Sequence, residues 1–131
     1  MALYEKMIEA IKKEIIVRSK NYNDEIETIY FGGGTPSLLK IKDINDIFQS
    51  IENNYRLSKN LEATIEANPD DLTKSKIKSL SRTKINRISL GIQTLNEDAL
   101  KFMKRIHSSK QSIESIENSL LFFKNLSIDL I

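Results

Sequence analysis

The chain has 131 residues, the size of one domain, and 40% of them are hydrophobic. It has 20 lysines and arginines and 18 acidic residues, so its net charge is only +2. The basic residues are also spread along the chain, and both observations argue against a nucleic-acid partner. With no cysteine, these residues offer no disulfide, no thiolate nucleophile and no cysteine ligand for a metal.

Membrane insertion and secretion are not expected either. No apolar run approaches the roughly 18 residues that a transmembrane helix needs. The first segment, MALYEKMIEAIKKEI, carries charges where a signal peptide has its apolar core. We therefore expect a soluble protein of the cytoplasm with no membrane span.

Hydrophobic spacing predicts helices that alternate with short strands. Apolar residues recur at helical intervals in the first segment and again after each run of β-branched residues. The expected order is helix 3–20, strand 25–31, helix 37–55, strand 61–67, helix 71–82, strand 86–92, helix 96–106, helix 109–125 and strand 126–131.

The spacing of the strands indicates how they are connected. They recur at intervals of roughly thirty residues, the length of a βαβ unit. This predicts an α/β fold with a four-stranded parallel sheet, right-handed crossovers and flanking helices. A helix opens the chain and a strand closes it, so we expect an incomplete domain whose outer strands have bare edges, completed by another copy or by a missing partner.

The polar residues that stand out follow the ends of the predicted strands, where parallel α/β proteins bind their ligands. Glycines 32–34 after the first strand would let the backbone contact a ligand closely. We expect Thr35 to cap the next helix and Pro36 to be its first residue. The glycines match neither a P-loop nor a GxGxxG motif, and a tight strand-to-helix turn would also explain them. The other polar residues at or near strand ends are Glu66, Asn68, Asp70, Gln93 and Asp129.

A purely structural explanation stays open for several of these residues. Glu66 and Gln93 would each be suited to capping a neighbouring backbone group. Arg105 is also the kind of charge that favours a helix C-terminus. We expect the lone His107 to be a solvated helix end, and the Asp70-Asp71 pair to be first-turn charges of a helix.

Four segments in their order and spacing carry a resemblance across essentially the whole chain. They are YFGGGTPSLL, TIEANPDDL, RISLGIQTLNEDALKFMKRIH and SIDLI. Together they resemble the coproporphyrinogen III oxidase-like radical S-adenosylmethionine (SAM) family. The resemblance implies a partial (β/α) barrel, with residues 1–131 as one domain truncated at both ends, from a radical SAM oxidoreductase of haem metabolism. The Ser-Leu-Leu after GGGTP, the EANP and the RIH are closer to its haem chaperone branch than to the true oxidases.

The resemblance also implies which residues bind the cofactor SAM. Arg105 would pair with the SAM carboxylate, a task that suits a planar cationic fork. No residue is implied to be catalytic or to bind a metal. The other implied contacts are Gly33, Gly34 and Thr35 at the SAM amino group, Gln93 and Asp129 at the ribose hydroxyls, and Glu66 in the same cleft.

One departure from the family bears on its chemistry. The family holds a [4Fe–4S] cluster with three cysteines, expected just before Leu3, and this chain has none. We therefore predict that the chain alone is catalytically inert, and that any haem or porphyrin binds through regions outside it. Two alternatives stay open: a non-catalytic, cluster-less SAM- or nucleotide-binding module, and a barrel enzyme that binds phosphate at the glycines.

Overall fold

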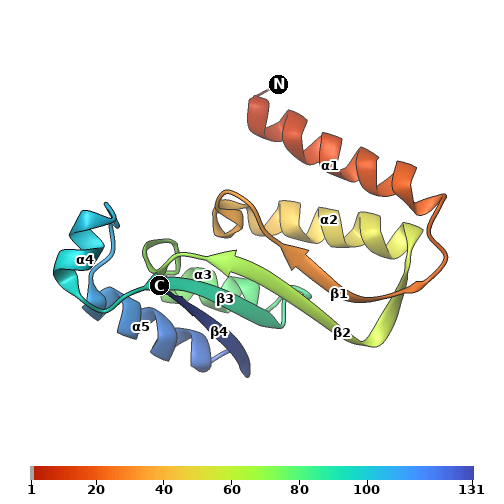
Figure 1. Ribbon diagram of the computed structural model, residues 1–131. Coiled ribbons are helices and arrows are strands. Elements are labelled where there is room, and N and C mark those ends of the chain that lie inside the picture. Colours follow the sequence, from red (N-terminus) through yellow and green to blue (C-terminus); the bar gives the residue numbers. More distant parts are fainter. Residues whose placement is uncertain (1) are drawn as a thin grey trace.

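The structure is a computed structural model that describes residues 2–131, and Figure 1 shows its helices and strands in chain order. The α-helices are α1 (Leu3–Ser19), α2 (Ile41–Asn54), α3 (Lys74–Leu80), α4 (Glu97–Phe102) and α5 (Ser109–Leu120). Two 3-10 helices, η1 (Pro36–Leu38) and η2 (Pro69–Asp71), follow the first two strands. The strands are β1 (Glu25–Phe31), β2 (Arg56–Ala67), β3 (Arg87–Gln93) and β4 (Asn125–Leu130).

The four strands form one sheet in the order β1-β2-β3-β4, and every neighbouring pair is parallel. This confirms the predicted α/β fold with parallel strands and flanking helices. All four strands end at the same edge of the sheet, because Phe31 pairs with Ile65 and Gly91 pairs with Asp129. Strands β1 and β4 are the outer strands, and within residues 2–131 their outer edges have no partner strand.

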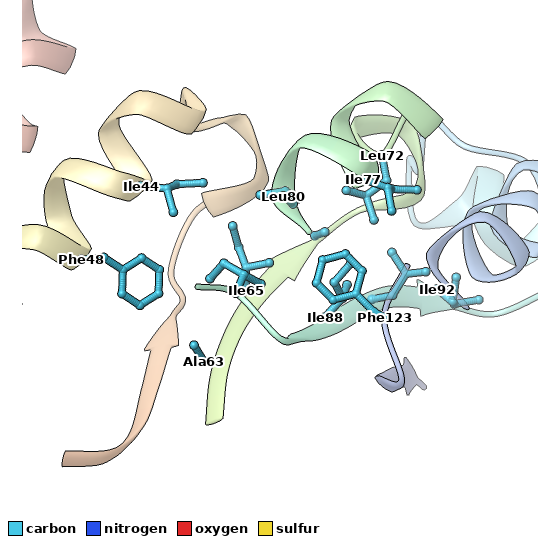
Figure 2. Packing of buried hydrophobic residues seen from close by; sticks show 13 residues of the cluster. Ile44, Phe48, Ala63, Ile65, Leu72, Ile77, Leu80, Ile88, Ile92 and Phe123 are labelled. Carbon is cyan, nitrogen blue, oxygen red and sulfur yellow. The ribbon is translucent and has the colours of Figure 1, made fainter. Parts of the chain in front are cut away.

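The core lies between one face of the sheet and helices α2, α3 and α5. Figure 2 shows Ile44, Leu80 and Ile77 lying over the strand residues Ile65 and Ile88. Since side chains alternate along a strand, the opposite face of the sheet carries the polar positions. These positions are Thr28 and Tyr30 in β1, Glu62, Thr64 and Glu66 in β2, Arg87 and Ser89 in β3, and Ser127 and Asp129 in β4.

Helix α1 packs against α2, away from the main core. The hydroxyl of Tyr4 donates to Asp43 Oδ2 at 2.6 Å, and that of Tyr55 donates to the Ile15 carbonyl at 3.2 Å. Of its side chains, Ile8 is the one that is fully buried. A cavity of about 530 Å³ lies between α1, α2 and β1 and is lined mainly by apolar residues.

Two helices begin later than predicted because each X-Pro pair starts a 3-10 turn first. Thr35 does precede the helical turn and Pro36 is its first residue, but the Thr35 side chain makes no capping hydrogen bond. Helix α3 begins at Lys74 instead of residue 71. Its N-cap is Thr73, whose hydroxyl accepts from the Lys76 N–H.

Helices α4 and α5 expose apolar residues that define their predicted helical pattern. The buried residues of α5 are Ser112, Ser115 and Ser119, whereas Ile113 and Leu120 are exposed. In α4, Leu100 is buried and Phe102 is 89% exposed. None of the helices in residues 2–131 is long and apolar enough to cross a membrane.

Candidate functional site

A polar cavity of about 360 Å³ lies at the carboxyl ends of the strands, where parallel α/β folds bind ligands. Every strand end or the loop after it contributes to the wall. The lining residues are Gly34, Thr35, Pro36, Glu66, Ala67, Asn68, Ser89, Gly91, Gln93, Arg105 and Asp129.

The glycine loop after β1 is ordered by Glu66. Gly33 and Gly34 have φ values of +84° and +61°, a left-handed region that strains any residue with a Cβ. The Gly33 N–H donates to Glu66 Oε2 at 3.1 Å, and the Tyr30 hydroxyl donates to Glu66 Oε1 at 3.0 Å. Partial burial raises the pKa of Tyr30 above its usual value, and the Glu66 carboxylate acts in the same direction. One carboxylate therefore connects β1, the glycine loop and β2.

The loop after β2 is joined to the glycine loop by a second carboxylate. Asp71 Oδ2 accepts from the buried Ser37 hydroxyl at 3.0 Å and from the Asn68 side-chain amide at 3.3 Å. Asp71 is a first-turn charge of a helical turn, as predicted. It also ties η1 to η2 and so fixes one wall of the cavity.

The third and fourth strands contribute Gln93 and Asp129. A Cβ added at Gly91 would lie 2.8 Å from Gln93 Nε2, so this glycine leaves the space that the Gln93 amide occupies. The Ser89 hydroxyl donates to Asp129 Oδ2 at 3.3 Å. Ser89 therefore orients the carboxylate of the neighbouring strand towards the cavity.

Arg105 comes from the loop between α4 and α5 and is half-buried. Its backbone N–H donates to the Leu100 carbonyl at 2.9 Å, which turns the chain at the end of α4. Among residues 2–131, no carboxylate forms an ion pair with its guanidinium. If Arg105 only stabilised the C-terminus of a helix, its guanidinium would have no anionic partner. A bound ligand with a carboxylate would supply that partner.

The prediction for His107 was wrong. Its side chain is buried, with 3% of the residue exposed, instead of solvated at a helix end. Nδ1 lies 3.3 Å from Asp70 Oδ1, and Nε2 lies 3.3 Å from the Ile92 carbonyl oxygen. The sequence misled because the Ser after His107 suggested an exposed cap. Ser108 does form a capping box with Gln111, but the histidine before it turns inward.

The structure brings the sequence-predicted site residues together. Gly34, Thr35, Glu66, Gln93, Arg105 and Asp129 line the cavity, and Gly33 adjoins it through its bond to Glu66. Sequence reasoning missed Tyr30 and Ser89. The available signal was strand alternation, since both lie on the same sheet face as Glu66 and Asp129.

Comparison with known proteins identifies the family. The sequence model described as the Radical SAM superfamily matches residues 2–129. The chain belongs to this superfamily. It is 42% identical over 108 residues to a protein named heme chaperone HemW from Buchnera aphidicola, and 38% identical over 126 residues to the Lactococcus lactis protein of the same name. These matches cover 82% and 95% of this chain, and they confirm the predicted coproporphyrinogen III oxidase-like branch.

Solved structures show the same fold. The coproporphyrinogen III oxidase HemN of Escherichia coli superposes with a TM-score of 0.85 and 22% identity, over 96% of this chain and 30% of that one. An archaeal Elp3 from Methanocaldococcus infernus superposes with a TM-score of 0.65. The chain spans 29% and 33% of the length of the two HemW relatives. It is thus a portion of a radical SAM barrel.

The cavity fits one of the two groups that the superfamily implies. Its guanidinium, carboxylates and open glycine backbone match the carboxylate, amine and hydroxyls of SAM. A [4Fe–4S] cluster needs thiolate ligands, and these 131 residues have no cysteine. Within residues 2–131, no group of three His, Asp or Glu side chains is arranged to hold a metal ion either.

Proposed function

We propose that this chain forms the SAM-binding part of a radical SAM protein of haem metabolism, of the haem chaperone type, that works in the cytoplasm. The observation that carries the proposal is the convergence of Arg105, Glu66 and Asp129 on one cavity beside an open glycine loop. The chaperone type is favoured over the oxidase because HemW relatives are 35–42% identical, whereas the HemN resemblance is one of fold.

The charge of the cavity supports SAM over an anionic ligand. SAM carries a sulfonium, an ammonium and a carboxylate, and so has one net positive charge. The cavity has two carboxylates, Glu66 and Asp129, and one guanidinium, Arg105, which leave one net negative charge. Complementary charge of this kind favours a cation that carries one local carboxylate. Inorganic phosphate would face two carboxylates at the same site.

Each residue has a proposed task. Arg105 pairs with the SAM carboxylate, because its guanidinium forms no ion pair within residues 2–131 and offers two parallel donors. Gly33 and Gly34, together with Thr35, hold the amino group, and no Cβ screens the backbone carbonyls of the two glycines. Gln93 and Asp129 bind the ribose hydroxyls, and Glu66 supplies negative charge within the same cleft.

The chemistry of the superfamily needs a partner that these residues do not provide. SAM supplies radical chemistry when a [4Fe–4S] cluster donates an electron, and these residues have no thiolate to bind a cluster. We propose that this polypeptide alone is catalytically inert. Reconstitution with iron and sulfide under argon should yield no 5′-deoxyadenosine, and its appearance would contradict the proposal.

Calorimetric titration tests the proposed ligand. The chain should bind SAM, bind neutral-sulfur S-adenosylhomocysteine more weakly, and not bind inorganic phosphate. Arg105→Met should weaken SAM binding by about tenfold or more, as expected for a lost charge-assisted pair. Arg18→Met is the matched control, because Arg18 lies on α1 and pairs with Glu14. Binding of phosphate instead of SAM would favour the phosphate hypothesis.

A non-catalytic SAM-binding module is the second candidate. The absence of cysteine from 131 residues favours it. The reading frame upstream of this coding sequence separates the two candidates. An in-frame Cys-x3-Cys-x2-Cys pattern would support a radical SAM enzyme, and a native start codon without that pattern would support the module.

Haem or porphyrin binding is proposed for regions of the relatives that this chain does not span. The sole histidine, His107, is buried and both its ring nitrogens face protein oxygens, so it is a poor axial ligand. Titration of hemin into this chain should therefore give no Soret shift of the histidine-ligated kind. A saturable shift that His107→Ala abolishes would contradict this assignment.

We also propose that the bare sheet edges allow the chain to form homo-oligomers. In the described part of the chain the outer edges of β1 and β4 are unpaired, and Ile128 and Leu130 on β4 are exposed. Sedimentation velocity should detect oligomers that Ile128→Lys weakens. A monomer at all concentrations would contradict this part of the proposal.

A further inference from the structure

Gln93 lies at the centre of an unusual turn at the end of β3. Its φ is +69°, in a region that residues with a Cβ rarely adopt. The N–H of Thr94 donates to the carbonyl of Ile92 at 2.8 Å, which is an i→i+2 hydrogen bond. A positive φ inside such a bond is the rare, strained form of the γ-turn. The register of β3 against β4 also shifts at this turn, between Gly91 and Gln93.

The strained turn lies in the wall of the cavity. Gln93 lines the cavity while it stays paired with Leu130 of β4, and its carbonyl accepts from the Ile131 N–H at 2.9 Å. Backbone strain of this kind is unfavourable and persists only where the surroundings fix it. The question is therefore which group fixes the turn.

His107 contacts the atom that closes the turn. Its Nε2 lies 3.3 Å from the Ile92 carbonyl oxygen, the same oxygen that accepts from Thr94. That oxygen already has a donor, so His107 is not needed to satisfy it and instead adds a second constraint. Nδ1 lies 3.3 Å from Asp70 Oδ1 in η2. Both neighbours are acceptors, so the ring donates to both only when both nitrogens carry protons.

The same ring lies two residues after Arg105. The loop before it contains Lys104, whose φ of +55° is the other positive value outside glycine in residues 2–131. The imidazole therefore joins three loops of the cavity: η2 after β2, the turn at Gln93, and the loop of Arg105. The ring thus contacts the strained turn at Gln93 and lies three residues after the strained Lys104 in the same loop.

We propose that His107 is a positioning residue of the SAM cavity. Its ring contacts the Ile92 carbonyl and Asp70 and so holds the Gln93 turn and the Arg105 loop together, an arrangement called the latch below. The inference about ligand binding rests on the proposed function, whereas the latch itself does not. His107 touches neither SAM nor any reacting atom, and acts through Gln93 and Arg105.

Two amide substitutions separate the contacts of the ring. In His107→Asn the side-chain nitrogen corresponds to Nδ1, so the Asp70 contact can form and the Ile92 contact cannot. In His107→Gln the nitrogen corresponds to Nε2, so the Ile92 contact can form. Both variants remove the ring, and His107→Asn loses one buried methylene more than His107→Gln does.

Amide hydrogen exchange of Thr94 reports the turn without any ligand. The exchange rate should rise about tenfold in His107→Asn, equivalent to about 1.4 kcal/mol, and should stay near the wild-type rate in His107→Gln. Amides in the middle of β3, such as that of Leu90, should change in each variant only as much as its global stability does. Urea unfolding supplies the global stability against which each local change is compared.

SAM affinity, measured by calorimetry, should follow the same order. We expect about a tenfold loss in His107→Asn and substantial rescue in His107→Gln. Unchanged Thr94 exchange in His107→Asn would overturn the latch, as would equal losses in both variants that track global stability. If the wild-type chain does not bind SAM, the proposed function fails, and the exchange measurement still decides the latch.

Discussion

The Glu66 carboxylate accepts a hydrogen bond from the Gly33 N–H through one oxygen and from the Tyr30 hydroxyl through the other. Both oxygens thus organise the wall of the cavity before any ligand arrives. This arrangement keeps a negative charge beside a loop that exposes its backbone. A ligand with a cationic sulfur would gain from that charge without first ordering the loop, which lowers the entropic cost of binding.

Glu66→Gln should separate the charge of this group from its shape. The glutamine can still accept from Gly33, so the fold should persist with a loss of about 1 kcal/mol in unfolding free energy. SAM affinity should fall by about tenfold because a charged partner is lost. S-adenosylhomocysteine lacks the sulfonium, so its affinity should change less.

Glu62→Gln is the matched control for that experiment. Glu62 lies on the same strand and the same face of the sheet, where it pairs with Arg87 at 3.6 Å outside the cavity lining. It should leave the affinities for both ligands unchanged. An equal effect of the two substitutions on SAM binding would indicate that SAM responds to the overall negative charge of this sheet face and not to a specific contact with Glu66.

Two glycine substitutions should differ in whether they lower stability or SAM affinity. Gly33→Ala meets no neighbouring atom but is strained by the φ of +84°, so it should lower stability by about 1–2 kcal/mol. Gly91→Ala would displace the Gln93 amide, a flexible group, and should lower SAM affinity with little loss of stability. Urea unfolding and calorimetry on both proteins measure the contrast. A large stability loss in Gly91→Ala with unchanged SAM affinity would contradict the idea that Gly91 leaves space for the Gln93 amide.

The sheet was predictable from the sequence because strand signals here are local. Strand β1 has the predicted bounds, since a β-branched run stops at glycines that cannot continue it. The helix starts were less predictable. Pro69 and the residues after it form a 3-10 turn before Thr73 caps α3, and helical periodicity alone does not distinguish these two kinds of turn.

The buried side of α5 and the place of His107 depend on tertiary contacts that no local pattern contains. The Ser115 hydroxyl donates to the Pro69 carbonyl at 3.0 Å, so α5 lies close to η2 and buries small residues there. His107 is drawn inward by the carbonyl of Ile92 and by Asp70, which are 15 and 37 residues away along the chain.

Leu80 and Phe102 should respond very differently to truncation, although both are large apolar residues on predicted helices. Leu80 is 0% exposed in the main core, whereas Phe102 is 89% exposed. Leu80→Ala should lower the free energy of unfolding by about 2–5 kcal/mol, and Phe102→Ala by less than about 0.5 kcal/mol. Equal losses in urea unfolding would indicate that another molecule or copy covers Phe102 in solution.

The stability of the Arg105 loop should depend on pH through Glu97. Hydrogen bonds from the hydroxyl and then the backbone N–H of Ser109 lower the pKa of Glu97 in the folded protein. A lowered folded pKa adds stability above the unfolded pKa of about 4.3, and this stability is lost as pH falls through the folded value. Glu97→Gln mimics the protonated side chain.

The difference in unfolding free energy between wild type and Glu97→Gln should therefore be constant from neutral pH down to about pH 5. It should shrink as pH falls below the unfolded pKa of about 4.3 and approach zero near the folded pKa. In a Ser109→Ala background the constant difference above about pH 5 should be smaller, because only the backbone N–H at 2.8 Å still donates to Glu97. A difference that grew on acidification would have the wrong sign for this carboxylate and would contradict its role in closing the loop.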